Sequence, residues 1–369
     1  MSQTPTVEPL GLLHGAEAAD AIASGFAQPL TAAGAAFTLA RLLNNTGTNP
    51  SFRRKPESIP PKNQRGLADG PPVVPAQSLP NQLLTPPTQW AGLLLSEPLI
   101  VGIVNVTPDS FSDGSDRLSP AQAVAAGIAM AEAGAAIIDV GGESTRPGSD
   151  PTPSDIEQAR ILPVIRELAQ AGLTVSVDTR NASTMEAALD AGAAIVNDVS
   201  ALSHDTKAAS LIARRRCPVV LMHMRGEPKT MQAHAVYGDI ALDVARELAD
   251  RLEAAERAGI AREQIALDPG IGFAKRASHS GELLRRLPLL LTLGCPLLVG
   301  LSRKSLIGSL GQVDRPKDRL PGSLAGALFA LSRGASILRV HDVPETAQAI
   351  RVWRAMVGPA TPYTSGRLP

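Results

Sequence analysis

The 369-residue chain has little cysteine, few aromatic residues and no excess of either charge. Its two cysteines, Cys217 and Cys295, are too few for a disulfide framework, so we expect packing residues in a reducing compartment. Because 35 basic residues balance 35 acidic ones, nothing favours nucleic acid or an anionic membrane as a partner. The sequence also lacks any charge-free apolar run of about 18 residues, and its first residues lack the pattern of a secretory signal. We therefore expect a soluble, cytoplasmic protein.

Three regions differ in composition. Residues 1–45 are Ala-rich, with a modest helical signal over 16–27 and 33–43, and form an N-terminal extension to which we assign no role. Residues 46–90 contain ten prolines and a few clustered basic residues, which favours an extended or flexible linker over an interaction tail. Residues 91–369 hold the main domain. We expect deletion of the first two regions to leave its activity intact.

The main domain alternates short apolar runs with helix-length amphipathic stretches. Ile, Val and Leu dominate the runs without strict alternation, which is typical of parallel strands covered on both faces. The runs cover residues 99–104, 136–140, 173–177, 194–199, 218–222, 264–267, 296–301 and 336–340. Eight such units fill the 259 residues from 99 to 357, close to the ~250 typical of a (β/α)8 TIM barrel. An open doubly wound α/β sheet is the alternative, but no G-x-G-x-x-G follows the first run.

Several helices have recognisable ends. Ser119-Pro120 predicts a cap and a first-turn proline before residues 121–133, and Thr152-Pro153 predicts the same before 156–169. Pro163 should kink that second helix or shift its boundary. Glycines that end helices in a left-handed conformation are expected at Gly134, Gly172, Gly192 and Gly334.

Polar side chains follow all eight apolar runs, whereas small or apolar residues precede six of the runs. They include Asn105, Asp113, Thr145, Arg146, Asp178, Asn197, His223, Arg225, Asp268, Lys275, Lys304, Ser305, Arg339 and His341. Taken singly, each could cap a helix or fill a structural role. In a barrel, however, the carboxyl ends of all strands open on one face, so together they predict one active-site mouth.

The third, fourth and sixth strands supply Asp178, Asn197 and Asp268 to the centre of this mouth. Carboxylate acceptors and an amide suit a flat heterocycle with an amino-pyrimidinone edge, to which Lys304 would donate a hydrogen bond. Paired carboxylates holding a divalent metal ion are the alternative interpretation.

A phosphate site is predicted beside this pocket. Arg339 and His341 lie two residues apart on the last strand, next to the first strand and Asn105, where they suit a phosphate group and its Mg2+ ion. The loops after the first two strands carry Asp113 and Arg146 at their tips and are candidates for closing over a substrate. Ser305, at a helix start, is a candidate carboxylate ligand.

Five stretches on this rim together resemble the dihydropteroate synthase family. They are NVTPDSFSDG at 105–114, GGESTRPG at 141–148, DPGIGF at 268–273, SRKS at 302–305 and RVHD at 339–342. The resemblance spans residues 99 to about 357 in order. It implies a transferase of folate (tetrahydrofolate) biosynthesis, which condenses (7,8-dihydropterin-6-yl)methyl diphosphate with 4-aminobenzoate to give 7,8-dihydropteroate and diphosphate.

The resemblance also implies roles for individual residues. Asp178, Asn197, Asp268 and Lys304 would hold the pterin, Asn105 would ligate Mg2+, and Arg339 and His341 would bind the diphosphate. Thr145 and Arg146 would contact the diphosphate and aminobenzoate side, Phe111 and Asp113 would belong to a loop that orders over the site, and Ser305 would bind the aminobenzoate carboxylate. A homodimer is implied as well.

Two positions depart from the family pattern. Ser115 follows Gly114 where a second glycine is common, and Ala274 replaces a frequent glycine before Lys275. Two rival functions are a pterin-dependent methyltransferase and a non-catalytic pterin-binding paralogue. The first would not need the Arg339 and His341 phosphate site, and the second would be expected to lose rim residues, of which none is lost.

Overall fold

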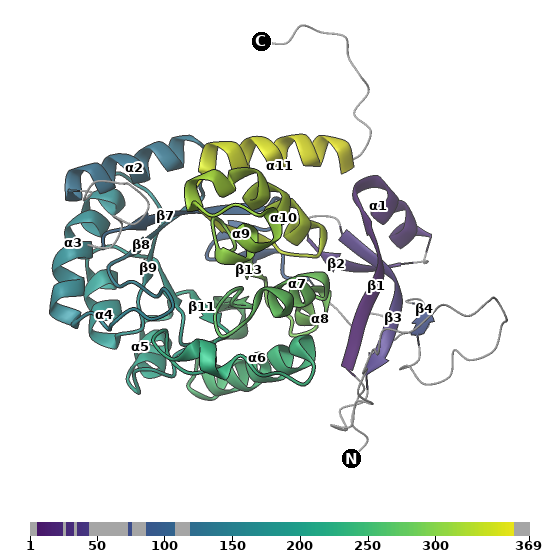
Figure 1. The fold of residues 1–369 in the computed structure, drawn as a ribbon, viewed down its shortest axis with the longest axis horizontal. Coiled ribbons are helices and arrows are strands. Elements are labelled where there is room, and N and C mark those ends of the chain that lie inside the picture. Colours follow the sequence, from purple (N-terminus) through teal and green to yellow (C-terminus); the bar gives the residue numbers. More distant parts are fainter. Residues whose placement is uncertain are drawn as a thin grey trace, which may run out of the picture.

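The computed structural model describes residues 6–24, 27–32, 35–43, 73–75, 86–107 and 119–357. Its centre is a sheet of eight parallel strands, surrounded by helices (Figure 1). The strands are β7 (Leu99–Asn105), β8 (Ile137–Gly141), β9 (Val175–Asp178), β10 (Ile195–Asp198), β11 (Val219–Met222), β12 (Ile265–Asp268), β13 (Leu298–Val299) and β14 (Ile337–Val340). They pair in the order β12-β11-β10-β9-β8-β7-β14-β13, and a parallel bridge from Leu267 to Leu297 joins the two ends. The predicted closed barrel is thus confirmed, and the open sheet is excluded.

Ten helices follow or connect these strands in the barrel part of the described chain. They are α2 (Pro120–Glu132), α3 (Ser154–Gln170), α4 (Ala182–Asp190), α5 (Ala208–Arg215), α6 (Ile240–Arg257), α7 (Ala277–Arg285), α8 (Pro288–Leu291), α9 (Ser305–Gly311), α10 (Leu320–Ser332) and α11 (Val343–Val357). Short 3-10 turns lie at Met231–His234, Arg262–Gln264 and Pro316–Arg319. None of the helices among the described residues is long and apolar enough to cross a membrane.

The predicted helix ends are mostly confirmed. Ser119 forms a capping box with Gln122, and Gly134, Gly172, Gly192 and Gly334 all have positive φ. The cap predicted at Thr152 is wrong, because α3 begins at Ser154 with Pro153 at the N-cap and no side-chain hydrogen bond. Helix α3 also continues through Pro163 to Gln170, so the proline does not shift the boundary.

Apolar side chains fill the amino end of the barrel. They include Leu99, Val101, Ile137, Ile195, Val220, Ala266, Leu298 and Ile337. A hairpin of β5 (Gln89–Trp90) and β6 (Leu93–Leu94) adds Trp90 to this cluster, with only 2% of the residue exposed. The Trp90 indole N–H donates to the Gln264 carbonyl over 3.0 Å. Trp90 therefore belongs to the barrel, the domain boundary lies before Gln89, and a deletion of residues 1–90 would remove a core side chain.

Part of the N-terminal extension forms a separate antiparallel sheet, to the right of the barrel in Figure 1. Strand β3 (Ala35–Leu43) pairs with β1 (Thr6–His14) on one side and with β2 (Gln28–Thr31) and β4 (Val73–Pro75) on the other, and α1 (Gly15–Ala23) follows β1. The helix predicted over 33–43 is therefore wrong, because strand pairing overrides the intrinsic helix preference of Ala and Leu. Strand β4 lies within the segment predicted as a linker.

The sheet packs on the barrel helices instead of extending away from them. Val7, Leu30 and Phe37 are buried in the same apolar cluster as the barrel core. Glu8, 2% exposed, accepts a hydrogen bond of 2.6 Å from Arg286, which also bonds Asp239 at the N-cap of α6. Cutting the chain at residue 90 would expose this apolar surface and leave Arg286 with one fewer partner.

Both cysteines are packing residues, as predicted. Cys217 and Cys295 are buried and unbonded to each other. Burial raises the pKa of the Cys217 thiol to about 11 and that of Cys295 to about 12. Because the thiolate is the reactive form, neither side chain is poised for chemistry.

Replacing Trp90 with alanine should destabilise the barrel through its amino end. We expect the free energy of unfolding to fall by about 3 kcal/mol, since a large aromatic side chain leaves a cavity. Chemical denaturation of full-length Trp90→Ala measures this loss. Trp353→Ala, at a partly buried position on α11, is the matched control and should lower the free energy of unfolding by less. An equal loss of stability in the two variants would contradict the assignment of Trp90 to the barrel core.

Candidate active site

The guanidinium of Arg339 lies at the centre of the barrel mouth. Its Nε donates to Asp139 Oδ2 over 2.6 Å, and its Nη2 donates to Asp178 Oδ2 over 2.7 Å. The Nδ2 of Asn197 donates to the same Asp139 oxygen over 3.0 Å. These side chains come from β14, β8, β9 and β10 and face the same interior, because Asp139 and Asn197 occupy inward positions of their strands. Barrel closure thus joins residues as far as 200 positions apart.

Asp268 and Lys304 complete this cluster from the next strands. The Lys304 ammonium donates to the Ile271 carbonyl over 2.7 Å and lies 4.7 Å from the centre of the Phe273 ring. Burial lowers the pKa of Lys304 to about 8, whereas the charge of Asp268 opposes this shift. Burial likewise raises the pKa of Asp268, with Lys304 opposing. Since Arg339 acts on both groups and Asp178 acts on Lys304, these four charged residues share one electrostatic environment.

Charge compensation in this cluster is incomplete. Burial raises the pKa of Asp178 to about 7; Arg339 opposes this shift, and the neighbouring Asp139 adds to it. Arg339 itself is buried, yet the carboxylates of Asp139 and Asp178 raise its pKa above the usual value. The site therefore holds a permanent cation beside a carboxyl group whose charged form is disfavoured by burial.

The predicted phosphate side lies where β14 and β7 pair. Asn105 ends β7, and its Oδ1 is 3.7 Å from the point where a Cβ on Gly141 would lie. His341 directly follows β14, and its Nδ1 is 3.1 Å from the hydroxyl of Ser302, which is buried. Asn105 and His341 are only partly buried, so both remain accessible from the mouth.

The loop after β8 carries Thr145 and Arg146 and is anchored at its start. Glu143 accepts two hydrogen bonds of 3.0 Å from Arg180, and both side chains are only 4% exposed. Thr145 is half-buried and Arg146 is exposed. Ser305, also exposed, is the first residue of α9. Phe111 and Asp113 lie outside the described residues, so their predicted place in a closing loop stays a prediction.

Comparisons with known proteins agree with this geometry. The sequence profile described as "Pterin binding enzyme" matches residues 101–341. Dihydropteroate synthase of Escherichia coli K12 is 47% identical over 268 residues, covering 72% of this chain and 94% of the relative.

The chain is also similar to solved structures. That of Xanthomonas albilineans dihydropteroate synthase with 4-aminobenzoic acid matches with a TM-score of 0.68 and 46% identity, over 74% of this chain and 97% of the other. That of the same enzyme in complex with 7,8-dihydropteroate matches with a TM-score of 0.65 and 45% identity, over 73% and 97%. The chain belongs to the dihydropteroate synthases. It is thus a pterin-binding transferase of the folate pathway.

Asp139 is the central residue that the sequence interpretation of this dihydropteroate synthase missed. It is fully buried, and its Oδ2 accepts hydrogen bonds from two predicted ligands, Arg339 and Asn197. A signal was present, because Asp139 is the one charged residue in the strand Ile137–Gly141. A buried strand tolerates an unpaired carboxylate poorly, so this acid predicts a cationic partner in the barrel interior.

Asp198, adjacent to Asn197, has a structural role instead. Its carboxylate accepts hydrogen bonds from the backbone N–H groups of Ser200 and Leu202 at 2.7 and 2.9 Å. These bonds stabilise a turn in which Ala201 and Leu202 have positive φ. Of these two neighbours at the end of β10, Asp198 thus stabilises the loop, whereas Asn197 lies in the pocket.

Asp139→Asn should impair the pocket through Arg339 and Asn197. We expect pterin affinity to fall about tenfold, since one buried charged hydrogen bond is lost. The charge of Asp139 raises the pKa of Asp178; without it this pKa falls, so the acidic limb of the pH profile should move to lower pH. Calorimetric pterin binding and a kcat/KM profile over pH measure both effects.

Glu8→Gln is the matched control for Asp139→Asn. Glu8 is also a buried carboxylate paired with an arginine, but it lies in the N-terminal sheet, outside the mouth. It should lower stability and leave pterin affinity and the pH profile unchanged. A folded Asp139→Asn protein with the wild-type pH profile would rule out the role assigned to Asp139.

Proposed function

We propose that this protein condenses (7,8-dihydropterin-6-yl)methyl diphosphate with 4-aminobenzoate to give 7,8-dihydropteroate and diphosphate, with Mg2+ on the diphosphate. The gathering of Asp178, Asn197, Asp268, Lys304 and Arg339 around one barrel mouth supports the proposal most directly. These five side chains offer the mixture of acceptors, donors and fixed positive charge that a pterin with an anionic leaving group requires. The ligands named for the Xanthomonas relatives, 4-aminobenzoic acid and 7,8-dihydropteroate, are one substrate and the product of this reaction.

Asp178, Asn197 and Asp268 are proposed to bind the amino-pyrimidinone edge of the pterin. A carboxylate accepts hydrogen bonds from ring N–H and amino groups, and the Asn197 amide oxygen adds an acceptor. Lys304 donates to a ring oxygen or nitrogen. Its ammonium is already held at a fixed position by the Ile271 carbonyl, so the pterin meets a donor that needs little reorganisation.

Asn105 suits a magnesium ion that is shared with the substrate. Its amide oxygen is a hard donor at the mouth of the barrel, beside Gly141. Among the described residues, no group of three or more His, Cys, Asp or Glu side chains is arranged to hold a metal ion. A Mg2+ ion that keeps waters and takes most other ligands from diphosphate oxygens fits such a one-residue site. When bound, it would neutralise charge on the leaving group.

The proposed reaction needs no covalent enzyme intermediate. The C–O bond to diphosphate breaks, the reduced pterin delocalises the positive charge on its methylene carbon, and the amine of 4-aminobenzoate attacks that carbon and then loses a proton. Arg339 and His341 stabilise the departing negative charge. Thr145 and Arg146 are proposed to contact the diphosphate and aminobenzoate side, Ser305 to bind the aminobenzoate carboxylate, and Phe111 and Asp113 to close the site.

We further propose a homodimer that acts in the cytoplasm. Exposed apolar side chains on adjacent helices, Phe329 on α10 and Val352 and Met356 on α11, support a subunit contact there. Sedimentation equilibrium measures the assembly, and a single-chain mass at micromolar concentration would argue against the dimer.

An assay of diphosphate release with both substrates tests the reaction. We expect turnover that depends on both dihydropterin diphosphate and 4-aminobenzoate. A methyltransferase would bind pterin without releasing diphosphate, and a non-catalytic paralogue would bind pterin without turnover. Absence of turnover in well-folded protein would therefore reject the proposed reaction.

His341→Ala should weaken the leaving-group site while keeping the fold. We expect kcat to fall about a hundredfold, as for loss of one charge-stabilising group, with pterin binding retained. Arg339→Ala should cost more, including stability, because Asp139 would remain buried without its cation. Arg285→Ala, at an exposed salt bridge on α7, is the control. Wild-type kinetics for His341→Ala would contradict the diphosphate assignment.

Removing Mg2+ should abolish turnover, and adding it back should restore activity. Asn105→Ala should raise the Mg2+ concentration for half-maximal activity about tenfold, since a single protein oxygen is lost from the ion. At saturating Mg2+, the kcat of Asn105→Ala should return close to the wild-type value although its affinity for Mg2+ stays lower. A magnesium titration curve identical to that of the wild type would remove Asn105 from the metal site.

A further inference from the structure

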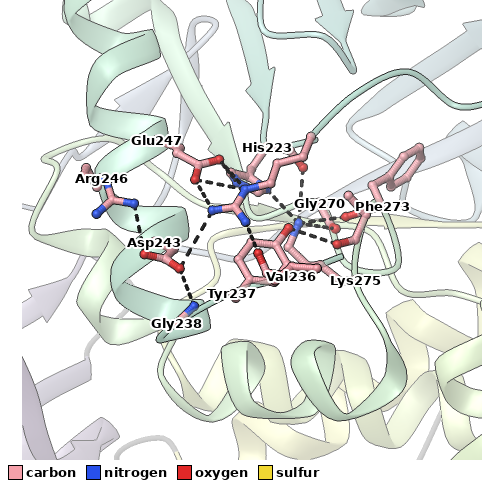
Figure 2. A network of polar contacts seen from close by, with 12 residues as sticks. His223, Val236, Tyr237, Gly238, Asp243, Arg246, Glu247, Gly270, Phe273 and Lys275 are labelled. Carbon is pink, nitrogen blue, oxygen red and sulfur yellow. Dashed lines mark hydrogen bonds and ion pairs between the residues drawn. The ribbon is translucent and has the colours of Figure 1, made fainter. Parts of the chain in front are cut away.

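Lys275 is a buried lysine that the proposed reaction does not use, and burial lowers its pKa to about 7 although the charge of Asp268 opposes this shift. Only 3% of the residue is exposed, and among the described residues no carboxylate forms an ion pair with its ammonium. Instead its ammonium has four acceptors: His223 Nδ1 at 2.8 Å, the carbonyls of Gly270 and Phe273 at 3.0 Å, and the His223 carbonyl at 3.3 Å (Figure 2). The ammonium therefore joins the loop after β12 to the end of β11.

The imidazole of His223 holds Lys275 in a defined orientation. Because Lys275 donates to Nδ1, the ring proton lies on Nε2, which donates to Glu247 over 3.0 Å. Burial lowers the pKa of His223 to about 4, and the charge of Lys275 adds to this shift although Glu247 opposes it. The ring is thus a neutral acceptor towards Lys275 at physiological pH.

The hydrogen-bond network of Lys275, His223 and Glu247 makes a second connection to the loop after β12, through Tyr237. Glu247 also accepts from Arg225, whose guanidinium lies 4.0 Å from the centre of the Tyr237 ring. The Tyr237 hydroxyl donates to the Ala274 carbonyl over 3.0 Å. Figure 2 shows His223, Glu247, Tyr237 and Lys275 around this short loop.

Every carbonyl from Gly270 to Ala274 accepts a side-chain hydrogen bond. Lys275 bonds those of Gly270 and Phe273, Lys304 that of Ile271, Gln232 that of Gly272, and Tyr237 that of Ala274. Among these donors Lys304 is the predicted pterin ligand. Lys275, Gln232 and Tyr237 hold the loop whose Ile271 carbonyl bonds Lys304.

The loop needs such support because two of its residues are flexible glycines and a third, Ala274, has an unfavourable left-handed backbone. Gly270, Gly272 and Ala274 have φ of +65°, +84° and +49°, and a left-handed residue other than glycine costs about 1 kcal/mol. A Cβ on Gly270 would lie 2.0 Å from the His223 carbonyl oxygen, so only glycine permits this approach. Without the donors listed above, the backbone would have little reason to keep this shape.

We propose that Lys275 is a positioning residue for the pterin pocket: it fixes the carbonyls of Gly270 and Phe273 on either side of Ile271, and thereby sets where Lys304, which bonds the Ile271 carbonyl, meets the pterin. This inference rests on the proposed function, since it assigns pterin binding to Lys304. Lys304 and Lys275 both donate hydrogen bonds to this loop. Loss of Lys275 would leave the carbonyls of Gly270 and Phe273 without this donor, and the Ile271 carbonyl that bonds Lys304 could then move.

Calorimetric titration of full-length protein with a 7,8-dihydropterin tests the proposal. Lys275→Met should weaken binding about tenfold, the effect of one buried hydrogen-bonding group, and raise KM for the pterin substrate more than it lowers kcat. Lys229→Met, at an exposed lysine paired with Asp150, is the matched control and should bind as the wild type does. Wild-type affinity in Lys275→Met would overturn the proposal.

A double-mutant cycle separates positioning from general stability. If Lys275 acts through Lys304, then Lys275→Met should weaken pterin binding by less than twofold when Lys304→Met is already present, because coupled residues are not additive. Full additivity would overturn the proposal. If Lys275→Met does not fold, Tyr237→Phe, which removes only the bond to Ala274, takes its place in the same cycle with a smaller expected loss. A wild-type protein that binds no pterin would instead reject the proposed function itself.

Discussion

The ion pairs of Arg339 with Asp139 and Asp178 are the constraint on which the mouth of the barrel depends. Burying a guanidinium is costly unless carboxylates and hydrogen bonds compensate it, and here two strands supply those carboxylates. The pairing requires β14 to lie two strands from β8 and three strands from β9 around the barrel. The order in which the strands pair therefore also determines the chemistry of the site. It also leaves the cluster with a carboxyl group, Asp178, whose pKa burial raises although Arg339 opposes this shift.

Much of the fold could be predicted, because each barrel strand is a compact apolar run with polar residues at its carboxyl end. All eight strands lie where the runs predict them, within a few residues. The helix predicted over 33–43 was wrong because Ala and Leu are compatible with either state, and the choice was made by pairing with β1, β2 and β4. Local preference cannot decide such a segment when its partners come from distant positions.

The site could be predicted as a set of residues but not as a set of contacts. Position at strand ends selected Asp178, Asn197, Asp268 and Lys304. The contact of Arg339 with Asp139 depends on the stagger between strands 200 residues apart, which no short motif records. His223 and Lys275 were recognised on the rim, but only the structure places them behind the pocket and facing each other. The positions of motifs in the sequence identify the residues at the barrel mouth, whereas the register of the paired strands determines which of those residues are in contact.

Hydrogen bonds from residues outside the pocket can make a small group of side chains selective for a flat heterocycle. A flat heterocycle offers few hydrogen bonds, so its affinity depends on donors and acceptors that are ordered before it arrives. Folding supplies that order twice here: Asp139 fixes Arg339 and Asn197 from beneath, and the donors around residues 270–274 fix the carbonyl that holds Lys304. We therefore expect residues that do not contact the substrate, such as Asp139 and Lys275, to govern affinity, and we propose that turnover depends on the leaving-group side around Asn105 and His341.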